Sequence, residues 1–202
     1  MRQVTLLALN MDDKDMGLIC TLSYLFLFRV QSEMIPLEAG VESELAAGLA
    51  QHRHSSACVK DGRLHIRLKS RKHRPQGSLL IRGCVCSHTL DARLCPVHCI
   101  DWSTMEVGEK LLQITPTAAQ QRLRRYSLLC GIPGASQVTL KVFRASRATT
   151  VALAGKPLHA IMHAGEWKSE AAQRYCSADA FDLGAMVSSV IQEDAVDDED
   201  SE

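Results

Sequence analysis

Residues 165–175 read Gly-Glu-Trp-Lys-Ser-Glu-Ala-Ala-Gln-Arg-Tyr and predict a helix that follows a Gly-x-Trp segment. The helix would carry one tyrosine, Tyr175, eight residues after Trp167. A phenol held at a fixed place on a short helix is a suitable nucleophile, because its oxygen can attack an electrophile and form a covalent intermediate. The segment looks like a nucleophile segment, and the alternative interpretation is that Tyr175 is a core or surface residue of an ordinary amphipathic helix.

Two blocks upstream offer the cations that an attack on a phosphodiester would need. Arg29 lies in a Phe-Arg-Val-Gln-Ser-Glu block, and Arg144 closes a Lys-Val-Phe-Arg block. Arginine suits a phosphate clamp because its planar guanidinium presents parallel donors and stays charged at any working pH. Arg29 also follows the apolar run 17–28, where a buried charge without a partner would be costly. We therefore expect a bound phosphate or Glu33 to compensate Arg29.

The order of these blocks along the chain resembles the tyrosine recombinases, also known as the phage integrase family. The resemblance spans about residues 16–176. It implies that two arginines clamp a phosphate, that a lysine in a β-hairpin turn is the general acid, and that an indole N–H donates to the phosphate. Glu33 would support the first arginine, and Lys141 stands where the family more often has histidine. The catalytic residues that the resemblance implies are Arg29, Lys72, Lys141, Arg144, Trp167 and Tyr175.

The resemblance implies an enzyme that breaks and rejoins DNA through a covalent 3′-phosphotyrosyl intermediate, with no metal or other cofactor for catalysis. Its partner would be double-stranded DNA, with a homo-oligomer on the DNA as a further expectation. Its role would be site-specific recombination or integration by a mobile element. Two alternatives stay open at this point: an inactive DNA-binding relic of such an element, held by salt-sensitive phosphate contacts, and a zinc-stabilised interaction module.

Charge is distributed unevenly along the chain. Residues 193–202 hold seven of the 23 acidic residues and no basic one, so the remainder carries a net charge of +7. This acidic tail has no apolar anchor, and we expect it to be disordered. Seven basic residues also fall within twenty positions, as expected for a surface that meets phosphates or for a solvated hairpin. They are Arg63, Arg67, Lys69, Arg71, Lys72, Arg74 and Arg82.

The N-terminal residues 1–10 lack the basic and long apolar regions of a secretory signal. We therefore expect an intracellular protein, in the nucleus if the source is a eukaryote. The apolar run 17–28 is much shorter than the roughly 20 residues of a membrane span, so it predicts a buried helix and no membrane partner. Eight cysteines at uneven spacing in a reducing compartment argue against a disulfide framework.

Hydrophobic periodicity predicts one mostly α domain over residues 1–192 with a small antiparallel three-stranded sheet, an α+β class that suits a tyrosine recombinase catalytic domain. The block 15–37 is expected to be a core helix that turns into a loop and ends at Pro36, with Arg29 toward the C-terminal end of the helix. The strands are expected at 57–59, 64–68 and 77–82, with turns at Asp61-Gly62 and at the basic stretch 69–74. Further helices are expected at 118–130, 143–154 and 158–164, before the one that carries Tyr175.

Soft metal ligands gather at 84–99, where they would form a Cys/His-rich insertion in the domain. A structural zinc on Cys84, Cys86, Cys95 and Cys99, with His98 as the alternative ligand, would pin a loop that has little core to bury. Cys-x-Cys is tighter than the usual Cys-x2-Cys pair of such sites, and ordinary reduced thiols are the other interpretation.

Overall fold

The computed structural model of the protein describes residues 1–42, 54–71, 75–88 and 91–167. The chain divides into two compact units, Met1–Phe143 and Arg144–Glu202, and each is described by itself. Lys72, the predicted helix with Tyr175 and the acidic tail lie outside the described residues. No helix within these ranges has both the length and the hydropathy of a membrane span.

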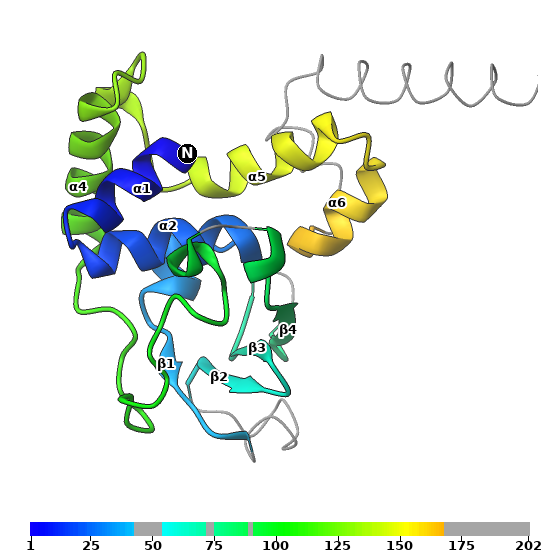
Figure 1. Ribbon diagram of the computed structural model, residues 1–202. Coiled ribbons are helices and arrows are strands. Elements are labelled where there is room, and N and C mark those ends of the chain that lie inside the picture. Colours follow the sequence, from blue (N-terminus) through cyan, green and yellow to red (C-terminus); the bar gives the residue numbers. More distant parts are fainter. Residues whose placement is uncertain (43–53, 72–74, 89–90, 168–202) are drawn as a thin grey trace, which may run out of the picture. The chain divides into compact units, whose positions relative to one another are not determined.

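Three helices of the first unit contact one another (Figure 1): α1 is Arg2–Asn10, α2 is Lys14–Phe26 and α4 is Pro116–Leu129. Asp13 caps α2 by accepting a hydrogen bond from the Met16 amide at 3.2 Å, and Thr115 caps α4 by accepting one from the Ala118 amide. The predicted helix at 118–130 is therefore confirmed. Most residues of α2 are buried, which explains the apolar run.

The helix predicted in the block 15–37 extends too far, because it includes Arg29. α2 ends after Phe26, because Leu27 adopts a left-handed conformation with φ 57°. The chain then forms a short π-helix, Val30–Met34, and Arg29 precedes it with an extended backbone. Apolar residues continue through the break into the same core, so their periodicity does not reveal where the helix stops.

A four-stranded sheet completes the first unit, in the order β1-β2-β3-β4. Its strands are β1 Glu38–Ala39, β2 Ser56–Lys60, β3 Arg63–Leu68 and β4 Ser78–Gly83. The three antiparallel strands β2, β3 and β4 and the α+β class are confirmed. The predicted sheet lacks β1, which pairs in parallel with β2 and is too short to show an alternating pattern.

One hydrophobic core joins the helices and the sheet of the first unit. Phe26 and Phe28 stack with their ring centroids 5.3 Å apart, and Leu64 and Ile66 of β3 are fully buried in the same cluster. Among the described connections of this unit, 3₁₀ helices lie at Cys86–His88, Ala92–Leu94 and Ala135–Gln137. The segment after α2 and the sheet are thereby fixed against one another.

The second unit is described as far as Trp167. α5, Val142–Leu153, begins at the end of the first unit, and α6 is Leu158–Gly165, so both predicted helices are confirmed. Ala148, Ala152 and Ile161 form a small core against which Trp167 packs. The single domain over 1–192 stays a prediction.

Candidate functional site

Arg29 and Glu33 form the ion pair that the sequence predicts as one way to compensate the arginine. Arg29 Nη1 donates to Glu33 Oε1 at 3.0 Å, and the Arg29 amide donates to Oε2 at 2.9 Å. The two side chains differ in exposure, since 35% of the Arg29 side chain is accessible against 2% for Glu33. The Glu33 carboxylate therefore binds both the backbone amide and the guanidinium of Arg29, and part of the Arg29 side chain remains exposed to solvent.

A second arginine, Arg71, binds the same carboxylate from the connection between β3 and β4. Its Nε donates to Glu33 Oε1 and its Nη2 to Oε2, both at 3.1 Å, and Nη2 also lies 3.5 Å from the Leu27 carbonyl oxygen. The side chain of Arg71 is 2% exposed. Two guanidinium groups thus bind one buried carboxylate. The sequence does not single out Arg71 as a partner of Glu33, because Arg71 stands among many basic residues.

Arg144 and Trp167 contact each other in the second unit. The Trp167 ring centroid is 4.3 Å from Arg144 Cζ, and Arg144 Nη2 donates to the Gly165 carbonyl oxygen at 2.6 Å. Arg144 is 3% exposed. An aromatic face and a carbonyl hold the planar guanidinium in one orientation, as an arginine that binds an oxyanion edge-on requires. The structure thus brings two of the predicted catalytic residues together.

The end of α6 sets the position of Trp167 through the backbone. Glu166 adopts a left-handed conformation, its amide donates to the His163 carbonyl at 3.2 Å, and the Trp167 amide donates to the Met162 carbonyl at 2.9 Å. This pair of hydrogen bonds is the Schellman motif. A Cβ on Gly165 would collide with the Trp167 ring, so only glycine leaves the ring its place over Arg144.

The other predicted catalytic residues are divided between the units and the undescribed segments. Lys141 is exposed in the first unit, directly before α5. Lys72 and Tyr175 lie outside the described residues. Since Arg29 and Arg144 belong to different units, the convergence of all six residues on one phosphate stays a prediction.

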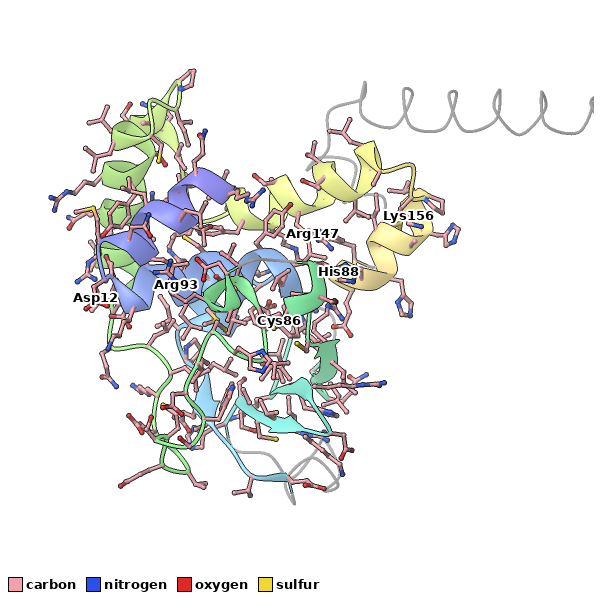
Figure 2. The ribbon with its side chains drawn as sticks, viewed as in Figure 1. Asp12, Cys86, His88, Arg93, Arg147 and Lys156 are labelled. Carbon is pink, nitrogen blue, oxygen red and sulfur yellow. The ribbon has the colours of Figure 1, made fainter. Side chains whose placement is uncertain are left out.

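A candidate metal centre lies in the first unit, directly after β4 (Figure 2). Figure 2 labels Cys86 of this cluster. The ligand atoms of Cys84, Cys86, Cys95 and His98 all lie within 4.8 Å of one another. His98 Nδ1 is 3.7, 3.1 and 3.4 Å from the sulfurs of Cys84, Cys86 and Cys95, and the sulfurs of Cys84 and Cys95 are 3.7 Å apart. Two sulfurs on one tetrahedral zinc lie roughly 3.8 Å apart, because Zn–S bonds are about 2.3 Å long. This cluster could therefore bind a metal ion.

Backbone amides around Cys95 favour its thiolate. Burial by itself raises the pKa of this thiol, but hydrogen bonds from the Val85 and Val97 amides and the contact with His98 lower the pKa to about 6. In contrast, burial and the neighbouring thiols raise the pKa of Cys86 to about 12. A thiolate beside the protonated thiol of Cys86 is a site at which a divalent cation can displace a proton.

Cys99 lies outside this cluster, and His98 takes the place that was expected for it. Cys99 Sγ donates to the Pro96 carbonyl oxygen at 3.4 Å. Burial, followed by the charge of Cys95, raises the pKa of Cys99 to about 12, so this thiol stays protonated. The His98 alternative gives a Cys-x2-His pair within one turn of the chain, which the Cys99 amide closes by donating to the Cys95 carbonyl oxygen at 2.9 Å.

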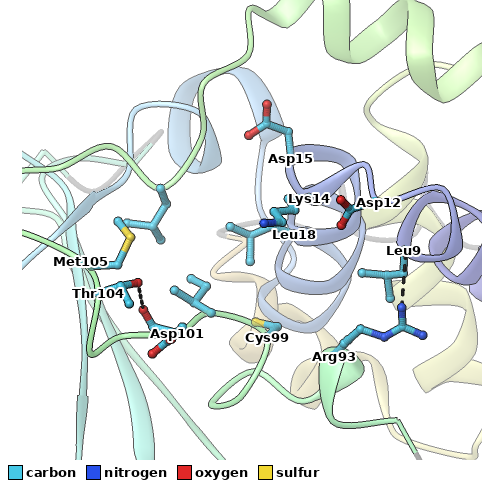
Figure 3. Close-up of a pocket in the computed structure, with 12 residues that line it drawn as sticks. Leu9, Asp12, Lys14, Asp15, Leu18, Arg93, Cys99, Asp101, Thr104 and Met105 are labelled. Atoms are coloured by element: carbon cyan, nitrogen blue, oxygen red, sulfur yellow. Dashed lines mark hydrogen bonds between the residues drawn. The ribbon is translucent and has the colours of Figure 1, made fainter.

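A cavity of 410 Å³ lies elsewhere in the first unit, lined by the start of α2 and by the loop after Cys99 (Figure 3). Asp12, Lys14 and Arg93 line it, and Arg93 Nη1 donates to the Leu9 carbonyl oxygen at 3.3 Å. Of the predicted catalytic residues that the structure describes, none contributes to the lining. The charged groups of this lining are of both signs.

Comparison of the chain with protein-family models, with curated proteins and with solved structures gives no match.

Proposed function

We propose that this protein breaks and rejoins double-stranded DNA through a covalent 3′-phosphotyrosyl bond, as a mobile-element recombinase does. The observation that carries the proposal is the stack of Trp167 on the buried guanidinium of Arg144. The resemblance assigns both residues to one phosphate, and they are in contact although α5 and α6 separate them along the chain. The Arg29–Glu33 pair adds support, because the resemblance assigns a supporting acid to that arginine.

In the proposed reaction Tyr175 loses its phenolic proton to water, and its oxygen attacks phosphorus and forms a new P–O bond, while the bond from phosphorus to the 5′ oxygen breaks. Lys72 donates a proton to that leaving oxygen. In the second step a 5′-hydroxyl attacks the phosphotyrosine and expels the phenol, so the number of phosphodiester bonds is conserved and no cofactor is consumed. Arg29 and Arg144 would hold the nonbridging oxygens, where negative charge develops, and the Trp167 indole N–H would donate to one of them.

A nicked duplex tests this proposal directly. The probe is a pool of DNA duplexes with randomised sequence around a nick, in which cleavage releases a short fragment that diffuses away and leaves the protein attached. We expect the full chain to form a protein–DNA adduct that survives denaturation, and Tyr175→Phe to form none. If the unmutated chain binds the pool but yields no adduct, the strand-transfer proposal is wrong and a DNA-binding relic remains.

We also propose that a structural zinc ion is bound by Cys84, Cys86, Cys95 and His98. A protein that acts as a zinc-stabilised interaction module would require this ion. The short distances between their ligand atoms favour it. Zinc bonds would join the end of β4 to the loop that contains His98, where the described connections are 3₁₀ helices and turns. Native mass spectrometry of the purified chain should show one zinc per chain, and a metal-free chain of equal thermal stability would contradict the assignment.

A further inference from the structure

We propose that Cys84 and Cys95 are a redox-active pair, which closes to a reversible disulfide and thereby releases the metal ion from its cluster. The inference rests on the proposed zinc site, and it adds the regulation of that site. Its basis is the placement of two free thiols that differ in exposure. Cys84 is exposed, Cys95 is buried, and their sulfurs lie 3.7 Å apart.

The two sulfurs need only a small movement to form a bond. The S–S distance of a disulfide is about 2.0 Å, so the two sulfurs have to approach each other by about 1.7 Å. The backbone holds both of them near this position, because the Val85 amide donates to Cys95 Sγ and the Cys86 amide donates to Cys84 Sγ, each at 3.4 Å. The fold therefore places the two thiols together before any bond forms.

Two neighbouring thiols could compete for the same reaction. Cys86 Sγ lies within 4.8 Å of the other ligand atoms, and the shortest contact given for it is the one with His98 Nδ1 at 3.1 Å. Cys99 Sγ donates to the Pro96 carbonyl oxygen and lies outside the cluster. The proposed pair joins an exposed sulfur, which an oxidant can reach, to a buried sulfur that can react only with its neighbours.

The oxidant in this reaction is a hydroperoxide. The Cys84 sulfur attacks one peroxide oxygen and the O–O bond breaks, so Cys84 becomes a sulfenic acid and hydrogen peroxide is reduced to water. The Cys95 sulfur then attacks the sulfenic sulfur and forms the S–S bond, while the hydroxyl group leaves as water with the thiol proton. Two thiols and one hydrogen peroxide thus give one disulfide and two water molecules. If zinc occupies the cluster, Zn²⁺ is a further product, and two protons from solvent replace the thiol protons.

Disulfide formation removes two of the four ligands. Cys86 and His98 remain, whereas a structural zinc site needs four ligands. Zinc should therefore leave when the disulfide forms, and a thiol reductant should restore both the thiols and the binding of zinc. Disulfides in a reducing compartment are usually transient and either catalytic or redox-sensing, which agrees with this behaviour.

Peptide mapping of the full, zinc-loaded chain tests the inference, with hydrogen peroxide as the probe. Trypsin leaves Cys84 in peptide 83–93 and Cys95 in peptide 94–110. After alkylation of the free thiols, mass spectrometry should find these two peptides joined by one disulfide, and dithiothreitol should separate them. A chromogenic zinc chelator should report one zinc ion released for each disulfide formed, relative to a sample without peroxide.

Three variants identify the sulfurs, and they are compared with the unmutated chain in metal-free form because two of them lack a zinc ligand. Cys84→Ser and Cys95→Ser should each abolish the link between the peptides. Cys99→Ser is the matched control, since this thiol lies in the same peptide as Cys95, and it should leave the yield unchanged. A link that persists in Cys84→Ser would identify Cys86 as the partner and overturn the assignment.

The outcomes distinguish this inference from the zinc assignment. A chain that binds zinc but gives only sulfinic acid or unlinked peptides with peroxide would overturn the redox pair and leave the zinc site intact. A disulfide that forms in a chain without affinity for zinc would support the pair and refute both the structural zinc and its release. Zinc that stays bound after the disulfide has formed would overturn the regulation. The mapping of the unmutated chain needs no variant, so a variant that fails to fold does not prevent a decision.

Discussion

Replacing Gly165 by alanine should move the Trp167 ring away from Arg144. A Cβ at this position would collide with the ring, which therefore cannot stay 4.3 Å from the guanidinium carbon. Arg144 is 3% exposed, and a cation–π contact of such a desolvated pair is worth about 2 kcal/mol. If this stabilisation is needed in the transition state, its loss slows DNA cleavage roughly 30-fold.

Fluorescence can follow the ring itself. The chain contains two tryptophans, so Trp102→Phe leaves Trp167 as the single indole. In that background Gly165→Ala should change the emission of Trp167 and make it easier for acrylamide to quench. His163→Ala, an exposed position on the same helix, should change neither property. Unchanged emission and quenching in Gly165→Ala would refute the packing argument, and a displaced ring with an unchanged cleavage rate would refute the role of the stack in catalysis.

Three further predictions concern the metal, the nucleophile and the tail. Cys95→Ser should lose the proposed zinc and lower the melting temperature, as a chelator should in the unmutated chain, whereas Cys99→Ser should keep the metal. Elemental analysis and thermal unfolding measure these effects. Retention of zinc by Cys95→Ser would contradict the assignment. Tyr175→Phe should abolish covalent DNA linkage with nearly unchanged binding, and Arg144→Ala should weaken both, as seen by adduct and gel-shift assays; an adduct that persists in Tyr175→Phe would identify another nucleophile. Deleting residues 193–202 should tighten nonspecific DNA binding at low salt, because seven negative charges no longer compete for basic surface, and unchanged affinity would exclude such competition.

Local elements could be predicted where a local signal determines them. The hairpin at Asp61-Gly62 has alternating apolar residues on both sides of a turn pair, and the observed strands follow that pattern. α4 has Thr115 as its cap and proline at its first position, which mark the start of a helix independently of tertiary contacts. The Arg29–Glu33 pair was also predictable, because the two residues are four apart and a charge beside an apolar run needs a partner.

Features that depend on distant contacts could not be predicted in this way. The left-handed Leu27 breaks α2 inside a continuous apolar stretch, and β1 owes its existence to pairing with β2 rather than to its own two residues. Arg71 is one of several neighbouring cations, and only the folded chain shows that it is the one that reaches Glu33. Likewise, His98 and Cys99 are adjacent in sequence, and the direction of the turn decides which of them joins the sulfurs.

The turn at the end of α6 affects which aromatic residues can be accommodated at position 167, beside Arg144. Trp167 is held through its backbone amide, and the left-handed residue before it is Glu166, so the path of the chain does not depend on the indole. A smaller ring at position 167 would begin from the same Cα and would still be directed over Arg144. Interchange of tryptophan with histidine, which the recombinase resemblance allows at this position, therefore requires no adjustment of the backbone. We therefore expect the C-terminal turn of α6 to accommodate either side chain at position 167.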